Sequence, residues 1–517
     1  MATAVALPPS GLSAVFCSRR SRKGKKFQAD KERKEPKRLL PYPKSVPTPL
    51  IIRAKPQQSK LQALNGVIKE IQESMKKGVF IEPQIVSSLL ETCYKLNALD
   101  EGVKLHQLLP SSLIYKNSGI SGKLVRLYAS CGLVEEAHEV FDQMPERGHS
   151  AFPWNSLIAG YSEMGLYEDA LALYFQMEEE CVAPDEFTFP RVLKACGGVG
   201  VVGVGEAVHR DVIRLGFGSN IFVQNALVDM YSKCGDIVKA RKVFASISCK
   251  DSVSWNTMLN ANFRHGLYSD ALQVFRQMIT EGVEPDSVAI STILSNLSFS
   301  PKLGIEIQGW ATRKGMNWDL SVANSLITMY SNNKKLVKAR YLFDHMPVRD
   351  LVTWNSIIQS HRNDPLVFTY LEAMEEKQCS PDAITFVLLL SSCAHLGLVD
   401  EAERLFSLMK GKYSISPSME HYACMVNAYG RAGMVDKAYR TIIEEMDIEA
   451  GPTVWGALLY SCFLHKNVDI AEIASQKVFD LEPDNELNFE LLMKIYADAG
   501  RLKDEERVRK MISDRGL

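Results

Sequence analysis

The sequence predicts an all-α protein, an α-solenoid (superhelix) made of helix-turn-helix repeats. Self-similarity is the first reason, because one phrase, Trp-Asn-Ser-Leu-Ile or a variant of it, returns at intervals of 101, 99 and 101 residues. It begins at Trp154, Trp255, Trp354 and, more distantly, Trp455. The second reason is a helical apolar period within the phrase, with i, i+3, i+4, i+7 spacing. The residues that show it are Trp154, Leu157, Ile158 and Tyr161.

Each repeated unit is expected to contain two helices. Gly165 ends the first helix, and residues 169–177 give the second, with its apolar residues on one side. Pro184 then stops the second helix just before the unit closes at Asp185. A unit this small cannot bury its apolar face alone, but stacked units can, and a stack presents a concave inner wall. The periodicity does not choose the hand of the superhelix.

Residues 1–60 are predicted to be an organelle transit peptide followed by a Pro-rich basic linker. Residues 1–29 contain no acidic residue and are rich in Ala, Ser and Arg, as transit peptides are. The Ala- and Ser-rich opening favours the chloroplast, and the arginines near residue 20 keep the mitochondrion as the alternative. Residues 30–60 cannot bury a core. Apolar periodicity begins near Leu61, and no apolar run is long enough to span a membrane.

Charge is divided unevenly along the chain. The formal net charge is −1, but residues 1–60 hold 15 basic and three acidic residues. Residues 61–517 therefore carry 45 basic and 58 acidic residues, a net charge of −13. This balance disfavours a nucleic-acid binder that works through bulk positive charge, so RNA binding would need a specific groove.

An asparagine recurs at one equivalent position of the first helix, and an aspartate closes each of the same units. The pairs are Asn155/Asp185, Asn225/Asp251, Asn256/Asp286, Asn324/Asp350 and Asn355/Asp382. Asn is a poor helix former, so its recurrence needs a cause. Capping of the first helical turn is one explanation. The other is that stacking places each carboxylate beside an amide on the groove wall, where the amide can read a base edge.

These features resemble the plant organellar pentatricopeptide repeat family, in its P-L-S subclass, across about residues 83–517. S-type phrases are Asn225-Ala-Leu-Val-Asp-Met-Tyr-Ser-Lys-Cys-Gly235 and His421-Tyr-Ala-Cys-Met-Val426, and L-type phrases are Val192-Leu-Lys-Ala-Cys196 and Ala207-Val-His209. The resemblance implies a partial helical cap at 61–82 and about eleven repeats over 83–450. Their expected bounds are 83–117, 118–148, 151–185, 186–220, 221–251, 252–286, 287–319, 320–350, 351–382, 383–418 and 419–450.

In this family the fifth and last residues of a repeat select an RNA base, and the second residue packs on it. Carried over, the five Asn/Asp pairs imply uracil, with cytosine tolerated, and a bound sequence U-N-U-U-N-U-U. The implied base-packing residues are Phe152, Phe222, Val253 and Val352. Ser321 departs from that pattern, as do the pairs Gly122/Gly148, Val387/Ser418 and Ala423/Ala450. Two repeats, 287–319 and 351–382, are two or three residues short, which affects local register.

Residues 452–485 resemble the E1 motif of the family and residues 486–517 the E2 motif, with no DYW deaminase domain after them. The chain has no H-x-E among its ten histidines and no C-x-x-C among its eleven cysteines. A zinc deaminase site therefore cannot be assembled, and we expect no catalysis, no metal and no cofactor.

The sequence favours a sequence-specific single-stranded RNA-binding protein in chloroplast transcript processing. Group II intron splicing is the preferred role. The alternative is recognition of C-to-U editing sites, with a deaminase recruited in trans. In either role, splicing or editing co-factors are expected to bind through the E motifs. A more distant alternative is a peptide-binding scaffold like the tetratricopeptide proteins, but their W-x-x-L-G-x-x-Y pattern is absent.

Overall fold

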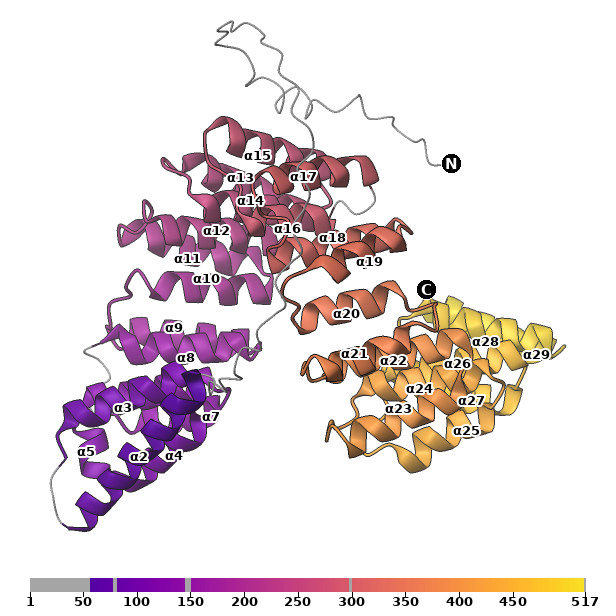
Figure 1. Ribbon diagram of the computed structural model, residues 1–517, viewed down its shortest axis with the longest axis horizontal. Helices are drawn as coiled ribbons and strands as arrows, with labels where there is room; N and C mark the ends of the chain where they lie inside the picture. Colours follow the sequence, from indigo (N-terminus) through magenta and orange to yellow (C-terminus); the bar gives the residue numbers. More distant parts are fainter. Residues whose placement is uncertain (1–55, 78–80, 145–149, 297–299, 516–517) are drawn as a thin grey trace, which may run out of the picture. The chain divides into compact units, whose positions relative to one another are not determined.

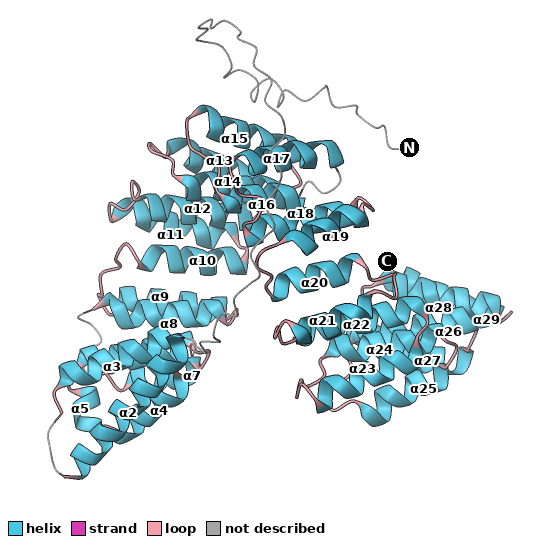
Figure 2. Cartoon of the chain, viewed as in Figure 1, coloured by secondary structure: helices cyan, strands magenta, loops and turns pink. Residues whose placement is uncertain are grey.

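The computed structural model describes residues 56–77, 81–144, 150–296 and 300–515, and every regular element in these residues is a helix (Figure 2). The predicted all-α fold class is confirmed. The predicted transit peptide and most of the linker lie outside the described residues. Helix α2 (Pro56–Lys76) begins before Leu61, with its proline at the first turn, where the missing N–H costs no hydrogen bond.

From residue 83 onward each expected unit contains one helical hairpin, made of a first and a second helix (Figure 1). The first helices are α3 (Pro83–Leu96), α6 (Ser118–Ser130), α8 (Ala151–Glu163), α10 (Thr188–Val199), α12 (Ile221–Lys233), α14 (Ser252–Arg264), α16 (Ser287–Asn296), α18 (Leu320–Asn332), α20 (Leu351–Ser360), α22 (Ala383–Leu396), α24 (Met419–Arg431), α26 (Pro452–His465) and α28 (Glu486–Asp498).

The second helices pack against the first. They are α4 (Leu99–Leu108), α7 (Val134–Asp142), α9 (Tyr167–Glu179), α11 (Val202–Arg214), α13 (Ile237–Ser246), α15 (Tyr268–Thr280), α17 (Pro301–Arg313), α19 (Leu336–His345), α21 (Val367–Glu376), α23 (Val399–Gly411), α25 (Val435–Arg440), α27 (Val468–Leu481) and α29 (Leu502–Arg515). Two short helices complete the set, α5 (Ser111–Tyr115) and the π-helix η2 (Thr441–Glu445).

The first helices form one continuous layer. Each first helix from α3 to α26 contacts the first helix of the next unit, and most second helices contact both their own first helix and the following one. Contacts between successive second helices are scarce, so the second helices form the looser layer. This nearest-neighbour packing is that of an α-solenoid.

The repeated tryptophans form the joints between units. Trp154, Trp255 and Trp354 are almost completely buried, as the apolar period predicts. Each meets the edge of a phenylalanine from the preceding second helix, with ring centroids 4.7, 5.1 and 4.9 Å apart. Burying a ring of this size stabilises a joint by roughly 4–6 kcal/mol relative to exposure.

A residue with positive φ makes the turn inside many hairpins. Gly165, predicted to end the first helix of its unit, has φ +79°, which glycine adopts without a Cβ clash.

No helix in the described part of the chain combines the length and apolar character needed to cross a membrane.

The shortened unit 351–382 keeps its register at the start of the first helix. Helix α20 has 10 residues, whereas α14 has 13. The loss falls at the carboxyl end, where His361 is buried and its Nδ1 lies 3.1 Å from the carbonyl oxygen of Ile357. The shortening therefore leaves the amino-terminal half of α20, which carries Asn355, in its usual place.

Candidate nucleic-acid interface

The five repeated asparagines lie within the layer of first helices. They occupy α8, α12, α14, α18 and α20, one or two turns after each helix begins. Four of them are 4–9% exposed, and Asn355 is half-buried. The asparagines are Asn155, Asn225, Asn256, Asn324 and Asn355. None of them is the cap of its helix, because each lies inside it.

Each asparagine is bonded to the aspartate that closes its unit. The distances from amide Nδ2 to carboxylate Oδ1 are 2.9 Å for Asn155/Asp185, 3.1 Å for Asn256/Asp286, 3.4 Å for Asn324/Asp350 and 3.3 Å for Asn355/Asp382. In the fifth pair, a hydrogen bond from Asn225 helps to lower the pKa of Asp251. Stacking of units thus brings together residues that lie 26 to 30 positions apart in sequence.

The aspartates, and not the asparagines, cap helices. In the three units that follow Asp251, Asp350 and Asp382, the aspartate is the N-cap of the next first helix, and its carboxylate accepts from a backbone N–H three residues on. Asp185 and Asp286 accept the equivalent bonds from the N–H groups of Thr188 and Ala289, both at 2.8 Å. Capping as the explanation for the asparagines is therefore wrong for these five residues.

Hydrogen bonds hold the capping carboxylates in their charged form. Burial acts to raise the pKa of Asp251, Asp350 and Asp382, but bonds from the following backbone N–H, from the Ser or Thr hydroxyl beside it and from the asparagine outweigh it. The net result is a pKa below the ordinary value for all three. The carboxylates are therefore ionised acceptors at neutral pH.

An ionised carboxylate fixes which end of each amide faces it. Because a carboxylate only accepts hydrogen bonds, the NH₂ group must turn toward the aspartate and the amide oxygen must turn away. Within the described residues, the amide oxygens of Asn155, Asn225, Asn256 and Asn324 are buried and have no hydrogen-bond donor. Leaving such an acceptor unpaired costs about 1–3 kcal/mol.

Asn355 differs from the other four asparagines. Its amide oxygen accepts a hydrogen bond from the hydroxyl of Thr385, at 2.8 Å. The same hydroxyl lies 2.8 Å from the carboxylate of Asp382. A ligand that donates to Asn355 would therefore compete with Thr385, or share the oxygen with it.

The four predicted base-packing residues are exposed apolar side chains near the start of first helices. Phe222, Val253 and Val352 are 69%, 58% and 58% exposed, and Phe152 is 38% exposed. Three further apolar residues, at the second position of the L-type units, are about as exposed as these four, and the sequence analysis did not identify them. They are Phe187, Val288 and Ile384. Carrying the register through the L-type units would have found them.

Two surface pockets bring an asparagine together with two successive apolar residues of this kind. A pocket of about 640 Å³ is lined by Phe222, Asn225 and Val253, among others. A second pocket, of about 300 Å³, is lined by Val352, Asn355 and Ile384. In both, the apolar side chains come from consecutive units and the asparagine from the first of the two. We call each such group of two apolar side chains and one asparagine a slot.

The sequence departures have clear structural counterparts. Ser321 is exposed and its hydroxyl donates to Asp319, at 2.7 Å, so it offers no apolar wall. Gly122 is buried, and a Cβ there would lie 3.3 Å from the Phe152 ring. Gly148 lies outside the described residues.

Family profiles match most of this helical stack. The PPR repeat family matches residues 149–198 and 250–298, and the PPR repeat matches 123–149, 225–251, 321–351, 384–413 and 420–444. The pentatricopeptide repeat domain matches 348–396, and the E motif matches 465–517. A chloroplastic pentatricopeptide repeat-containing protein of Arabidopsis thaliana is 57% identical over 481 residues, covering 92% of this chain and 91% of the relative.

This chain belongs to the pentatricopeptide repeat family. The chloroplastic pentatricopeptide repeat-containing protein CRR2 of Arabidopsis thaliana is 35% identical, over 84% of this chain and 67% of that protein. Among solved structures, the pentatricopeptide repeat protein PPR10 in complex with an 18-nt psaJ RNA element matches 86% of this chain and 71% of its own, with a TM-score of 0.56. At 18% identity, that match shows a shared fold.

No cluster of three or more His, Cys, Asp or Glu side chains suited to a metal ion occurs in the described ranges. The cysteines there are unpaired thiols, and burial raises the pKa of Cys93 to about 11 and of Cys462 to about 12. Such thiols are protonated and act as small apolar side chains.

Proposed function

We propose that this pentatricopeptide repeat protein binds single-stranded RNA, and that its five Asn/Asp units select uracil. The observation that carries the proposal is the set of four buried amide oxygens without a donor, each turned away from a carboxylate; the fifth, that of Asn355, accepts from Thr385. Uracil presents the N3–H donor that such an oxygen needs, whereas cytosine has an acceptor at the same ring position. The apolar side chains of consecutive units then enclose the ring, as base-packing residues do in other single-strand binders.

The proposed target is U-N-U-U-N-U-U, read 5′ to 3′ from the amino-terminal end of the stack. The letters N fall on the L-type units 186–220 and 287–319. The weakest enclosed base should be the one opposite unit 320–350, where Ser321 supplies no apolar wall. That PPR10 is solved with a bound RNA element supports an RNA ligand for this chain as well.

The test is a binding selection on randomised RNA with the wild type and with Asn256→Thr, keeping Asp286. A hydroxyl at the same base edge should shift the preferred base at that position from uracil toward guanine, by roughly 1–3 kcal/mol of discrimination. The matched control is Asn260→Thr, the same change one turn along α14 at an exposed site. The reading of the asparagines fails if wild type selects no uracil-rich consensus, or if Asn256→Thr selects the wild-type sequence.

We further propose that the protein acts in chloroplasts, without catalysis of its own, in group II intron splicing. Two similar Arabidopsis proteins are labelled chloroplastic. A reporter fused to residues 1–60 should enter chloroplasts, and an exclusively mitochondrial or cytosolic signal would contradict this. Recognition of C-to-U editing sites, with partners bound through the E motif, is the alternative role. Organellar transcripts of a knockout, scored for spliced junctions and edited sites together, decide between the two.

A further inference from the structure

The two base slots differ in the charge that surrounds them. The pocket that holds Val352, Asn355 and Ile384 is lined without a single charged side chain. The pocket that holds Phe222, Asn225 and Val253 extends along α10, α8 and α6 and is lined by three cations. These are Arg126, Arg191 and Lys194. In a helical stack with a net charge of −13 over residues 61–517, this is a local basic site.

Arg191 is the central cation of this site. Its guanidinium is half-buried and donates to the carbonyl oxygen of Phe187 at 2.5 Å. Burial lowers the pKa of Arg191, and the Asp185 carboxylate acts in the opposite direction. A half-buried guanidinium with most of its five donors unused is suited to an anion.

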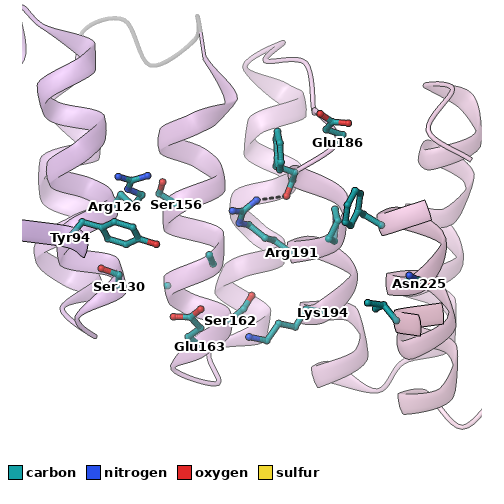
Figure 3. Close-up of a pocket in the computed structure, with 16 residues that line it drawn as sticks. Tyr94, Arg126, Ser130, Ser156, Ser162, Glu163, Glu186, Arg191, Lys194 and Asn225 are labelled. Atoms are coloured by element: carbon teal, nitrogen blue, oxygen red, sulfur yellow. Dashed lines mark hydrogen bonds between the residues drawn. The ribbon is translucent and has the colours of Figure 1, made fainter. Parts of the chain in front are cut away.

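The other two cations flank Arg191. Figure 3 shows Lys194 one turn further along the helix and Arg126 on the far wall beside Tyr94. Lys194 is exposed, whereas Arg126 is held by Glu91 and lies 4.0 Å from the centre of the Tyr94 ring. Lys194 and Arg191 are therefore the cations free to approach a ligand.

Two acidic side chains also line the pocket. The carboxylate of Glu186 accepts from the Asn220 amide at 3.2 Å. Glu163, from α8, also lines the pocket, and its charge acts on Arg191. With three cations against two carboxylates the lining keeps a positive balance, which Glu163 weakens.

We propose that Arg191 and Lys194 bind a phosphodiester of the RNA strand, the one that joins the nucleotides opposite units 186–220 and 221–251. This rests on the proposed function and adds to it a place where the strand is anchored independently of sequence. The site is continuous with the slot at Asn225, so a bound base there brings its 5′ phosphate toward α10. A strand is favoured over a free phosphate because the same pocket supplies the apolar walls of a base.

The first test compares Arg191→Gln/Lys194→Gln with the wild type on one U-N-U-U-N-U-U RNA at several salt concentrations. Each lost phosphate contact should lower the slope of log affinity against log salt by about 0.7. Affinity should fall roughly tenfold with an unchanged base consensus. The matched control is Arg210→Gln, an exposed arginine of the same unit on α11. Lys194→Gln alone, at an exposed site, guards against misfolding of the double variant.

The second test locates the phosphate. An RNA whose linkage between the second and third nucleotides is an uncharged methylphosphonate should bind the wild type roughly tenfold more weakly. The same RNA should bind the double variant no more weakly than unmodified RNA does, since the contact is already lost. A neutral linkage between the sixth and seventh nucleotides, beside the uncharged pocket, should cost much less. Glu163→Gln should strengthen binding of unmodified RNA.

The outcomes separate the two proposals. If the wild type binds no uracil-rich RNA, the proposed function itself is wrong. If it binds such RNA but the double variant keeps the wild-type salt slope, or the neutral linkage weakens both proteins equally, the anchor is wrong and the base reading stands. Competition by inorganic phosphate at millimolar concentration, with no effect of the neutral linkage, would mean a free-phosphate site and also overturn the proposal.

Discussion

A single aspartate side chain serves two repeats at once. The carboxylate of Asp286 accepts from both sides, from the Asn256 amide of its own unit and from the N–H of Ala289 in the next. The first bond orients the amide, and the second satisfies a free N–H at the start of α16. Orientation of a base-reading group and initiation of the next helix are thus coupled in one residue.

The two roles of Asp286 can be separated by substitution. Serine is nearly as good a helix cap, so Asp286→Ser should change stability by less than about 0.5 kcal/mol, whereas Asp286→Ala should cost about 1 kcal/mol. Both variants remove the carboxylate that orients Asn256, so both should weaken uracil selection at that position. Thermal unfolding and a binding selection check these outcomes. A wild-type uracil preference in both variants would show that the carboxylate does not orient the amide.

At the scale of the helix, close packing of neighbouring first helices depends on small residues. A Cβ built on Gly160 of α8 would lie 2.7 Å from the Ala129 Cβ of α6 and 3.2 Å from its backbone. Neither group can move aside without separating the helices. The approach of α8 to α6, which closes one wall of the basic pocket, therefore requires glycine at this position.

Gly160→Ala should destabilise the protein by roughly 1–3 kcal/mol, because the two helices must move apart. Gly456→Ala in α26 is the matched control, since a Cβ there meets nothing within 4 Å. Because alanine has a higher helix propensity than glycine, Gly456→Ala should stabilise the protein by up to about 1 kcal/mol. Thermal unfolding of both variants measures the difference. A neutral Gly160→Ala would mean that α6 and α8 are not held at this distance in solution.

At the scale of the whole molecule, the net negative charge of the helical stack opposes RNA binding, so affinity for RNA must come from local contacts. Residues 61–517 carry a net charge of −13, which repels a polyanion at long range. Any affinity for RNA must then come from the repeated slots and from the few cations placed beside them. Three cations line the pocket along α10.

We therefore expect a shallow salt dependence of RNA binding. A strand held at the one phosphodiester proposed above should show a slope of about −0.7 for log affinity against log salt. Binding of a matching RNA from low to moderate salt measures the slope. A slope several times steeper would mean that the strand follows a broad basic surface, contrary to the sequence and the structure.

The sequence by itself determined the fold class, the helix pairing and the recurrence of one asparagine and one aspartate in each of five units. These follow from local information: the 3.6-residue period around Trp154, the break at Gly165 and an asparagine and aspartate that recur once per unit. The same reasoning could have identified the exposed residues Phe187, Val288 and Ile384, since each is the second residue of its unit. Residues 1–55, on which the predicted destination depends, lie outside the described structure.

Only the tertiary structure decided that the aspartates cap the following helices and that the asparagines lie buried beside them. Asn355 and Asp382 lie 27 positions apart, and their hydrogen bond exists because units stack. Stacking also leaves four amide oxygens buried without a donor and gathers Arg126 and Arg191 from separate units into one pocket. A sequence period gives the spacing of residues along a helix, but the surroundings of a polar atom depend on helices brought together by packing.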